Sequence, residues 1–133
     1  MEGIKYNKLA NLSHSKFRRN SGVSKHVFEM MFLVVSDGLK FKKKTGRTNK
    51  ISIADRILML LEYYREYRTF FHIGLDYGLH EVNVQRNIAQ TEKILIQSGY
   101  FRLEGKRVLA TDISIDNIRI DVTECPVQRP KKK

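Results

Sequence analysis

The chain has 133 residues, of which 41% are hydrophobic, and a formal net charge of +11. This length accommodates one ordinary domain, or one small domain and part of another, and the apolar content is too high for general disorder. No run approaches the roughly 20 apolar residues needed to span a bilayer, and the N-terminus lacks the apolar core of a secretory signal. The single cysteine, Cys125, excludes an internal disulfide and suggests no zinc site. We therefore expect a soluble intracellular protein without a membrane partner.

The positive charge is concentrated in the N-terminal part of the chain. Residues 1–50 carry 12 Lys or Arg against 3 Asp or Glu, whereas residues 51–120 carry 9 of each. Because Lys and Arg side chains displace condensed counterions from phosphates, this distribution favours a polyanionic partner. A basic face that serves only solubility is the alternative.

Residues 1–44 are expected to form a basic, helical N-terminal region. The pattern predicts a helix over residues 8–21, in which Ser13 can act as an N-cap. A second helix can begin after Ser24, and it ends either near Gly38 or at Phe41. The expected apolar face of this second helix consists of Val27, Phe28, Met30, Met31, Phe32, Val34 and Val35.

A basic linker, residues 45–51, follows this region. The basic residues in and before this linker are predicted to contact DNA phosphates without sequence preference. The ones that we single out are Lys42, Lys43, Lys44 and Arg47.

Residues 52–99 are predicted to contain three helices. The first begins after Ser52 and runs to about Arg68, with Asp55 at the capping-box position from which a carboxylate can reach back to the N-cap amide. The other two helices cover residues 69–77 and 81–98. The expected buried face of the first helix consists of Ile53, Ile57, Leu58, Leu61 and Tyr64.

The second and third of these helices have the pattern of a helix-turn-helix. Thr69 can cap the second helix, Gly78 can take the left-handed conformation of the turn, and Gly74 is small enough for a close approach. The expected seam consists of Ile73, Tyr77, Leu79, Val84 and Ile88, with His72 and His80 as surface or capping residues. An ordinary helical hairpin would show the same spacing, so the pattern alone leaves both alternatives open.

If the third helix enters a DNA major groove, its exposed early turns supply the base contacts. Arg can bind guanine, and Asn or Gln can bind adenine. The predicted DNA-binding residues on this helix are Glu81, Val82, Asn83, Gln85 and Arg86. Asn87 and Gln90 are weaker candidates, because their direction depends on how the helix packs.

The hydrophobic period changes near the C-terminus. Ile118, Ile120 and Val122 alternate with polar residues, which predicts a strand. A lone strand cannot bury its apolar face, so residues 100–133 are expected to be the start of a further domain.

Two stretches resemble bacterial insertion-sequence transposases of the DDE class. The resemblance is most specific in the segments EYYREYRTFFHIG (62–74) and DVTECPVQRPKKK (121–133). It implies a mainly α chain, in which a trihelical helix-turn-helix follows a small helical region and a C-terminal strand belongs to a truncated ribonuclease-H-like domain. It also identifies Asp121 with the first of three acidic residues that hold divalent metal ions, implying magnesium for the complete enzyme and no cofactor for this chain.

The same resemblance implies a function and a location. The chain is expected to bind double-stranded DNA, namely the terminal repeats of its element, in the bacterial cytoplasm at the nucleoid, and to lack catalysis alone. Two origins fit the sequence. The chain is either a transposase cut short by mutation or the upstream product of a two-frame element, in which residues 131–133 would be encoded where the ribosome slips between the two frames. The alternatives are a regulator that occludes the element ends or promoter, a nuclease in its own right, and a module that assembles with itself or with full-length transposase.

Overall fold

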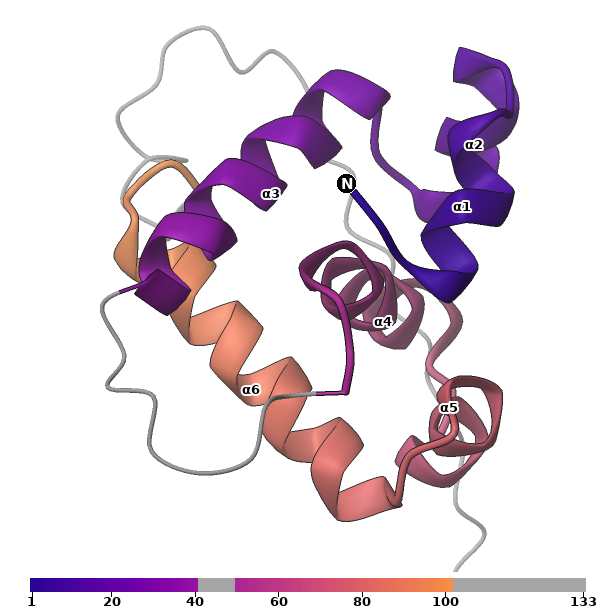
Figure 1. Ribbon diagram of the computed structural model, residues 1–133, viewed down its shortest axis with the longest axis vertical. Helices are drawn as coiled ribbons and strands as arrows, with labels where there is room; N and C mark the ends of the chain where they lie inside the picture. The colour runs from indigo at the N-terminus through magenta and orange to yellow at the C-terminus, as the bar shows by residue number, and fades with distance from the viewer. Residues whose placement is uncertain (41–49, 102–133) are drawn as a thin grey trace, which may run out of the picture. The chain divides into compact units, whose positions relative to one another are not determined.

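The computed structural model describes residues 1–40 and 50–101, which contain six helices and no strand (Figure 1). The helices pack within one unit, Met1–Arg102, which includes the predicted N-terminal region and the predicted helix-turn-helix domain. The expected mainly α fold is confirmed for these residues, whereas the predicted C-terminal strand lies outside them. The helices are α1 (Ile4–Ala10), α2 (His14–Ser21), α3 (Lys25–Lys40), α4 (Ile53–Glu66), α5 (Phe70–Tyr77) and α6 (Glu81–Gln97).

Helix α4 is the centre of this unit. It packs against each of the other five helices, and Figure 1 looks almost along its axis. All of residues 54–60 are buried, so α4 has no solvent-exposed face over its first two turns. The fully buried side chains contributed by other helices include Phe17 and Phe28, whose rings meet edge to face with centroids 5.5 Å apart.

The helix predicted over residues 8–21 is in fact two helices, so this expectation is wrong. Ser13 is the N-cap of α2 and accepts from the Lys16 amide at 3.4 Å. An N-cap residue has extended backbone dihedrals, and Ser13 has ψ 158°, so a single helix cannot run through it.

Helix α3 begins after Ser24 as expected, with the Ser24 hydroxyl accepting from the Val27 amide at 3.3 Å. It continues through Gly38 to Lys40, and Gly38 packs directly against the Ile94 side chain of α6. A Cβ at this position would collide with Ile94, so the glycine permits the close crossing of α3 and α6. Met30 is 37% exposed, which contradicts its predicted place in the core, because the buried stripe follows Phe28, Met31 and Val35.

Helix α4 begins after Ser52 as predicted, since the Ser52 hydroxyl accepts from the Asp55 amide at 3.1 Å. The helix ends at Glu66, two residues before the predicted end, because Tyr67 adopts a left-handed conformation with φ 51°. The predicted burial of Tyr64 is wrong: it is 50% exposed, and its hydroxyl donates to Glu92 of α6 at 2.7 Å. This hydrogen bond is the main reason why the pKa of Tyr64 is raised to about 12.

The Asp55 carboxylate caps helix α1 and not its own helix. Of the predicted capping box, the hydrogen bond from the Asp55 amide to the Ser52 hydroxyl is therefore the part that is confirmed. The two carboxylate oxygens accept from the backbone amides of Ile4 at 2.7 Å, Lys5 at 3.2 Å and Tyr6 at 2.9 Å. The N-cap residue of α1 is Gly3, which has no side chain to satisfy these amides. A buried carboxylate on α4 therefore supplies the cap and fixes α1 against the core.

We predict that Asp55→Ala lowers the free energy of unfolding by about 2–4 kcal/mol, because three first-turn amides lose a charged acceptor. Urea denaturation followed by circular dichroism measures this loss. Asp37→Ala is the matched control, because Asp37 is exposed on α3 and pairs with Lys40 at the surface. The control is expected to stay within about 0.5 kcal/mol of the unchanged protein, and equal losses in both variants would contradict the assigned cap.

Candidate nucleic-acid interface

Helices α5 and α6 are joined by a tight turn with the predicted capping residues. The Thr69 hydroxyl accepts from the His72 amide at 3.3 Å, and Gly78 ends α5 in a left-handed conformation with φ 64°. Gly74 lies so close to the carbonyl oxygen of Leu79 that a Cβ at position 74 would collide with this oxygen. His80 is the N-cap of α6 and accepts from the Val82 amide at 3.3 Å, so its predicted capping role is confirmed.

Helix α6 has a buried face and an exposed polar face. Of the predicted seam, Ile73, Val84 and Ile88 are buried, whereas Tyr77 and Leu79 are half-buried. On the outer side of α6, five polar residues recur at three- and four-residue spacing and so follow one line along the helix. We call them the polar stripe: Asn83, Arg86, Gln90, Lys93 and Gln97. All are exposed except Gln90, which is half-buried.

The five residues predicted on α6 to contact bases are all exposed, but they do not share one face. Asn83 and Arg86 belong to the polar stripe, with Val82 close beside it. Glu81 and Gln85 lie on the opposite flank, together with Glu92, which accepts from Tyr64. Carboxylates repel DNA phosphates, so the polar stripe is the more suitable face of α6 for a nucleic acid. Lys93 and Gln97 were missed, although their spacing from Asn83 and Arg86 was a usable signal.

A buried arginine lies behind the polar stripe. The guanidinium of Arg56 on α4 donates from Nε to the Asn87 amide oxygen at 2.8 Å and from one terminal nitrogen to the Gln90 amide oxygen at 2.9 Å. Burial lowers the pKa of Arg56, although arginine remains protonated in proteins. Asn87 is buried and its amide nitrogen donates to the Asn83 carbonyl at 2.7 Å, so its side chain faces the core and is not part of the exposed surface of α6.

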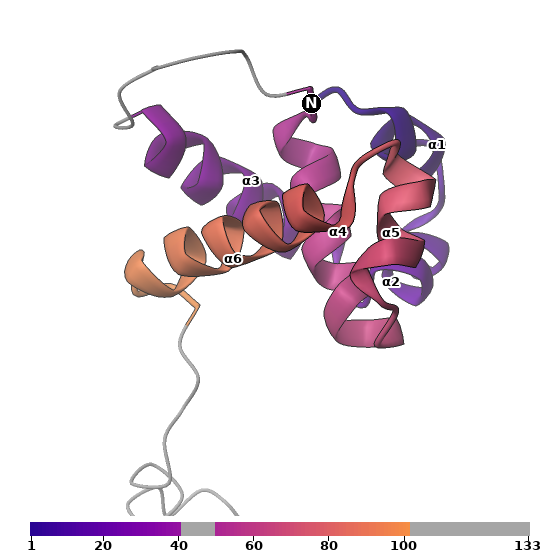
Figure 2. The ribbon, with the colours of Figure 1, turned by 90° about the horizontal axis from the view of Figure 1, so that it is seen from below.

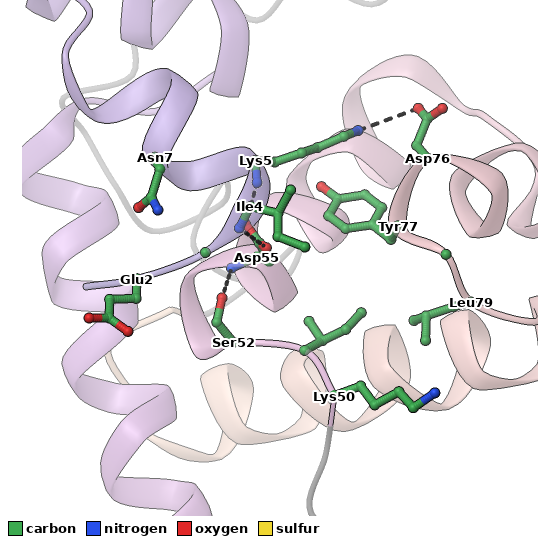
Figure 3. A pocket seen from close by; sticks show the side chains of 13 residues that line it. Glu2, Ile4, Lys5, Asn7, Lys50, Ser52, Asp55, Asp76, Tyr77 and Leu79 are labelled. Atoms are coloured by element: carbon green, nitrogen blue, oxygen red, sulfur yellow. Dashed lines mark hydrogen bonds and ion pairs between the residues drawn. The ribbon is translucent and has the colours of Figure 1, made fainter.

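A cavity of about 760 Å³ lies between the N-terminal segment, the start of α4 and the turn between α5 and α6 (Figure 3). Three of its charged side chains have partners within the protein: Asp55 binds the α1 amides, and Lys5 pairs with Asp76 at 3.4 Å. Lys5 also pairs with Glu62 at 3.1 Å. A hydrogen bond from Arg68 is the main cause of the lowered pKa of Asp76. These contacts tie α1, α4 and α5 together, which is a structural role.

Several predicted site residues lie outside the described ranges. They are Lys42, Lys43, Lys44 and Arg47, predicted to contact phosphates, and Asp121, assigned by resemblance to metal binding. Within residues 1–40 and 50–101, no cluster of three His, Cys, Asp or Glu side chains could hold a metal ion. In the same ranges, no helix is both long and apolar enough to cross a membrane.

Comparison with known proteins identifies the part of the chain that carries this interface. The family model for the helix-turn-helix of DDE superfamily endonucleases matches residues 49–101. These residues are therefore similar to that helix-turn-helix family. Helices α4, α5 and α6 all lie within the match, which favours the predicted helix-turn-helix over the alternative of an ordinary helical hairpin.

A curated relative extends the similarity beyond the DDE endonuclease helix-turn-helix. The probable transposase for insertion sequence element IS702 of Microchaete diplosiphon is 48% identical to the chain over 130 residues. These residues make up 97% of the chain and 47% of the relative, so the chain spans about half the length of that transposase. The resemblance to insertion-sequence transposases is thereby confirmed. No solved structure matches the chain.

We predict that Gly74→Ala destabilises this helix-turn-helix, although alanine normally favours a helix interior by about 1 kcal/mol over glycine. The added Cβ meets the backbone oxygen of Leu79, which cannot rotate away, so the net loss is about 1–2 kcal/mol. Urea denaturation gives the loss, and Leu75→Ala on the exposed face of α5 is the control. A Gly74→Ala variant more stable than the unchanged protein would show that the turn can relax.

Proposed function

We propose that this chain is a sequence-specific DNA-binding portion of an insertion-sequence transposase, and that it recognises the terminal repeats of its element. The observation that carries the proposal is the polar stripe on α6, the helix that follows the turn of a DDE endonuclease helix-turn-helix. In helix-turn-helix proteins, this second helix lies in the major groove and presents side chains to base edges.

The two predicted classes of contact have different roles in this proposal. Asn83 and Arg86 of the polar stripe read base edges, since arginine matches guanine and asparagine matches adenine. The basic residues between positions 42 and 47 neutralise phosphates, which adds affinity without sequence preference. Lys93 is exposed on the same stripe and adds positive charge to the same face.

We further propose that the chain alone does not cut or join DNA. Two divalent ions about 3.5–4 Å apart need several carboxylates, and the family resemblance assigns Asp121 alone to this role in the 133 residues. The relevant metal in a complete transposase is magnesium, which carboxylate oxygens suit.

The base-reading role predicts a loss that depends on sequence. Arg86→Ala or Asn83→Ala should cost about 1–3 kcal/mol on the preferred site and relax selection at one base pair. Binding to an oligonucleotide library, followed by titration of the selected site and a random duplex, measures both effects. The control is Arg19→Ala, which removes the same charge from the exposed surface of α2 and should leave selection unchanged. Equal losses on selected and random DNA would show that α6 does not read the sequence.

The catalytic role predicts a null result. The purified 133-residue chain should neither nick nor join element ends in magnesium or manganese, and Asp121→Ala should leave its DNA affinity unchanged. A cleavage assay on labelled terminal repeats tests this expectation. Metal-dependent nicking that disappears in Asp121→Ala would overturn the proposed lack of catalysis, because further metal ligands would then have to lie within this chain.

A further inference from the structure

The side chain of Gln90 has its direction set by the buried Arg56 behind it. Arg56 is 4% exposed and donates to the Gln90 amide oxygen at 2.9 Å. Arginine has five N–H donors and no acceptor, so the amide atom that faces it has to be the oxygen. The Gln90 amide nitrogen, with its two N–H donors, is therefore the end of the amide turned away from Arg56.

Arg56 itself is held in one place. Its Nε donates to the amide oxygen of Asn87 at 2.8 Å, and the Asn87 amide nitrogen donates to the Asn83 carbonyl one turn earlier. Asn87 is thus engaged at both ends of its amide and is buried between α4 and α6. A guanidinium that is fixed by a buried partner and closed in by the core cannot swing away from Gln90 without also breaking its hydrogen bond to the Asn87 oxygen.

We propose that Gln90 is a specificity-determining residue that presents hydrogen-bond donors to guanine, and that Arg56 is the residue that positions it. This inference rests on the proposed function, in which α6 lies in the major groove. Gln90 belongs to the polar stripe with Asn83 and Arg86, so it shares the face that we assign to the bases.

The chemistry of base edges distinguishes this arrangement from the usual role of glutamine. Glutamine ordinarily makes a bidentate contact with adenine, in which its amide oxygen accepts from N6 and its amide nitrogen donates to N7. That pairing needs both amide atoms to face the base, whereas Arg56 turns the Gln90 oxygen toward α4. An amide that offers only donors matches guanine, whose major-groove edge presents two acceptors, O6 and N7.

Site selection on the 133-residue chain and its variants tests the proposal. The unchanged protein should select guanine at the position that Gln90 contacts. Gln90→Ala should identify this position, because it should reduce the preference for guanine over adenine there by roughly 5- to 150-fold. Arg56→Met frees the amide to turn, so the preference at that same position should move toward adenine. Gln90→Ala combined with Arg56→Met should select as Gln90→Ala does alone. Arg65→Met, the same change at an exposed position of α4, is the matched control.

A second variant keeps Arg56 in place, in case its removal unfolds the protein. Gln90→Glu retains the contact with Arg56 as an ion pair and offers acceptors in place of donors. Its preference at the same position should therefore change from guanine to cytosine, whose N4 amino group donates in the major groove. Thermal melting followed by circular dichroism confirms that each variant is folded.

The outcomes separate this inference from the proposed function. If the unchanged protein selects no sequence, the proposed function fails and the inference fails with it. If it selects a site but Arg56→Met and Gln90→Glu leave every position unchanged, the inference alone is overturned. A loss of affinity that is uniform across all sequences would assign Gln90 to a phosphate, which also overturns its role as a base reader.

Discussion

Helix α4 carries two adjacent buried side chains of opposite charge, and each of them contacts a different neighbouring helix. Asp55 accepts from three amides of α1, whereas Arg56 donates to two side-chain amides of α6. Burying a charge is unfavourable unless hydrogen bonds replace its hydration, so each of these residues tolerates few arrangements of its partner helix. The placement of α1 on one side and of α6 on the other therefore depends on the same turn of α4.

This arrangement bears directly on how α6 is presented. The helix is held by α4 through Arg56 and Tyr64 and by α3 at the Gly38–Ile94 crossing. Figure 2 shows α6 from below, where it lies across α4 and α3. A base-reading helix has to keep its side chains in register with the groove, and a helix packed on two others has little freedom to rotate. The polar stripe is thus fixed by helices that come earlier in the chain, including one outside the residues that the family model matches.

The sequence predicted the local features of this fold well. Capping depends on amides within a few positions, so the sequence alone identifies the cap and turn residues. These residues are Ser13, Ser24, Ser52, Thr69 and Gly78. The prediction failed where contacts are distant: nothing near Asp55 indicates that its carboxylate serves α1, and nothing near Arg56 indicates burial against α6. Hydrophobic spacing also misplaced Tyr64, because α4 is buried on all sides only over residues 54–60 and becomes exposed in its last turn, where Tyr64 lies. Which residues of α6 form the proposed base contacts cannot follow from exposure alone, since Glu81 and Asn83 are both exposed yet lie on different flanks.

The position of Asp55 along the chain affects how the protein is made. Its carboxylate accepts from an amide 51 residues earlier, at Ile4. Synthesis proceeds from the N-terminus, so the residues of α1 leave the ribosome well before their cap does. A helix of seven residues is too short to persist in water without such a partner. We therefore expect the nascent chain to keep its first helix unformed until α4 has emerged, so that the N-terminal segment completes its structure together with the helix-turn-helix.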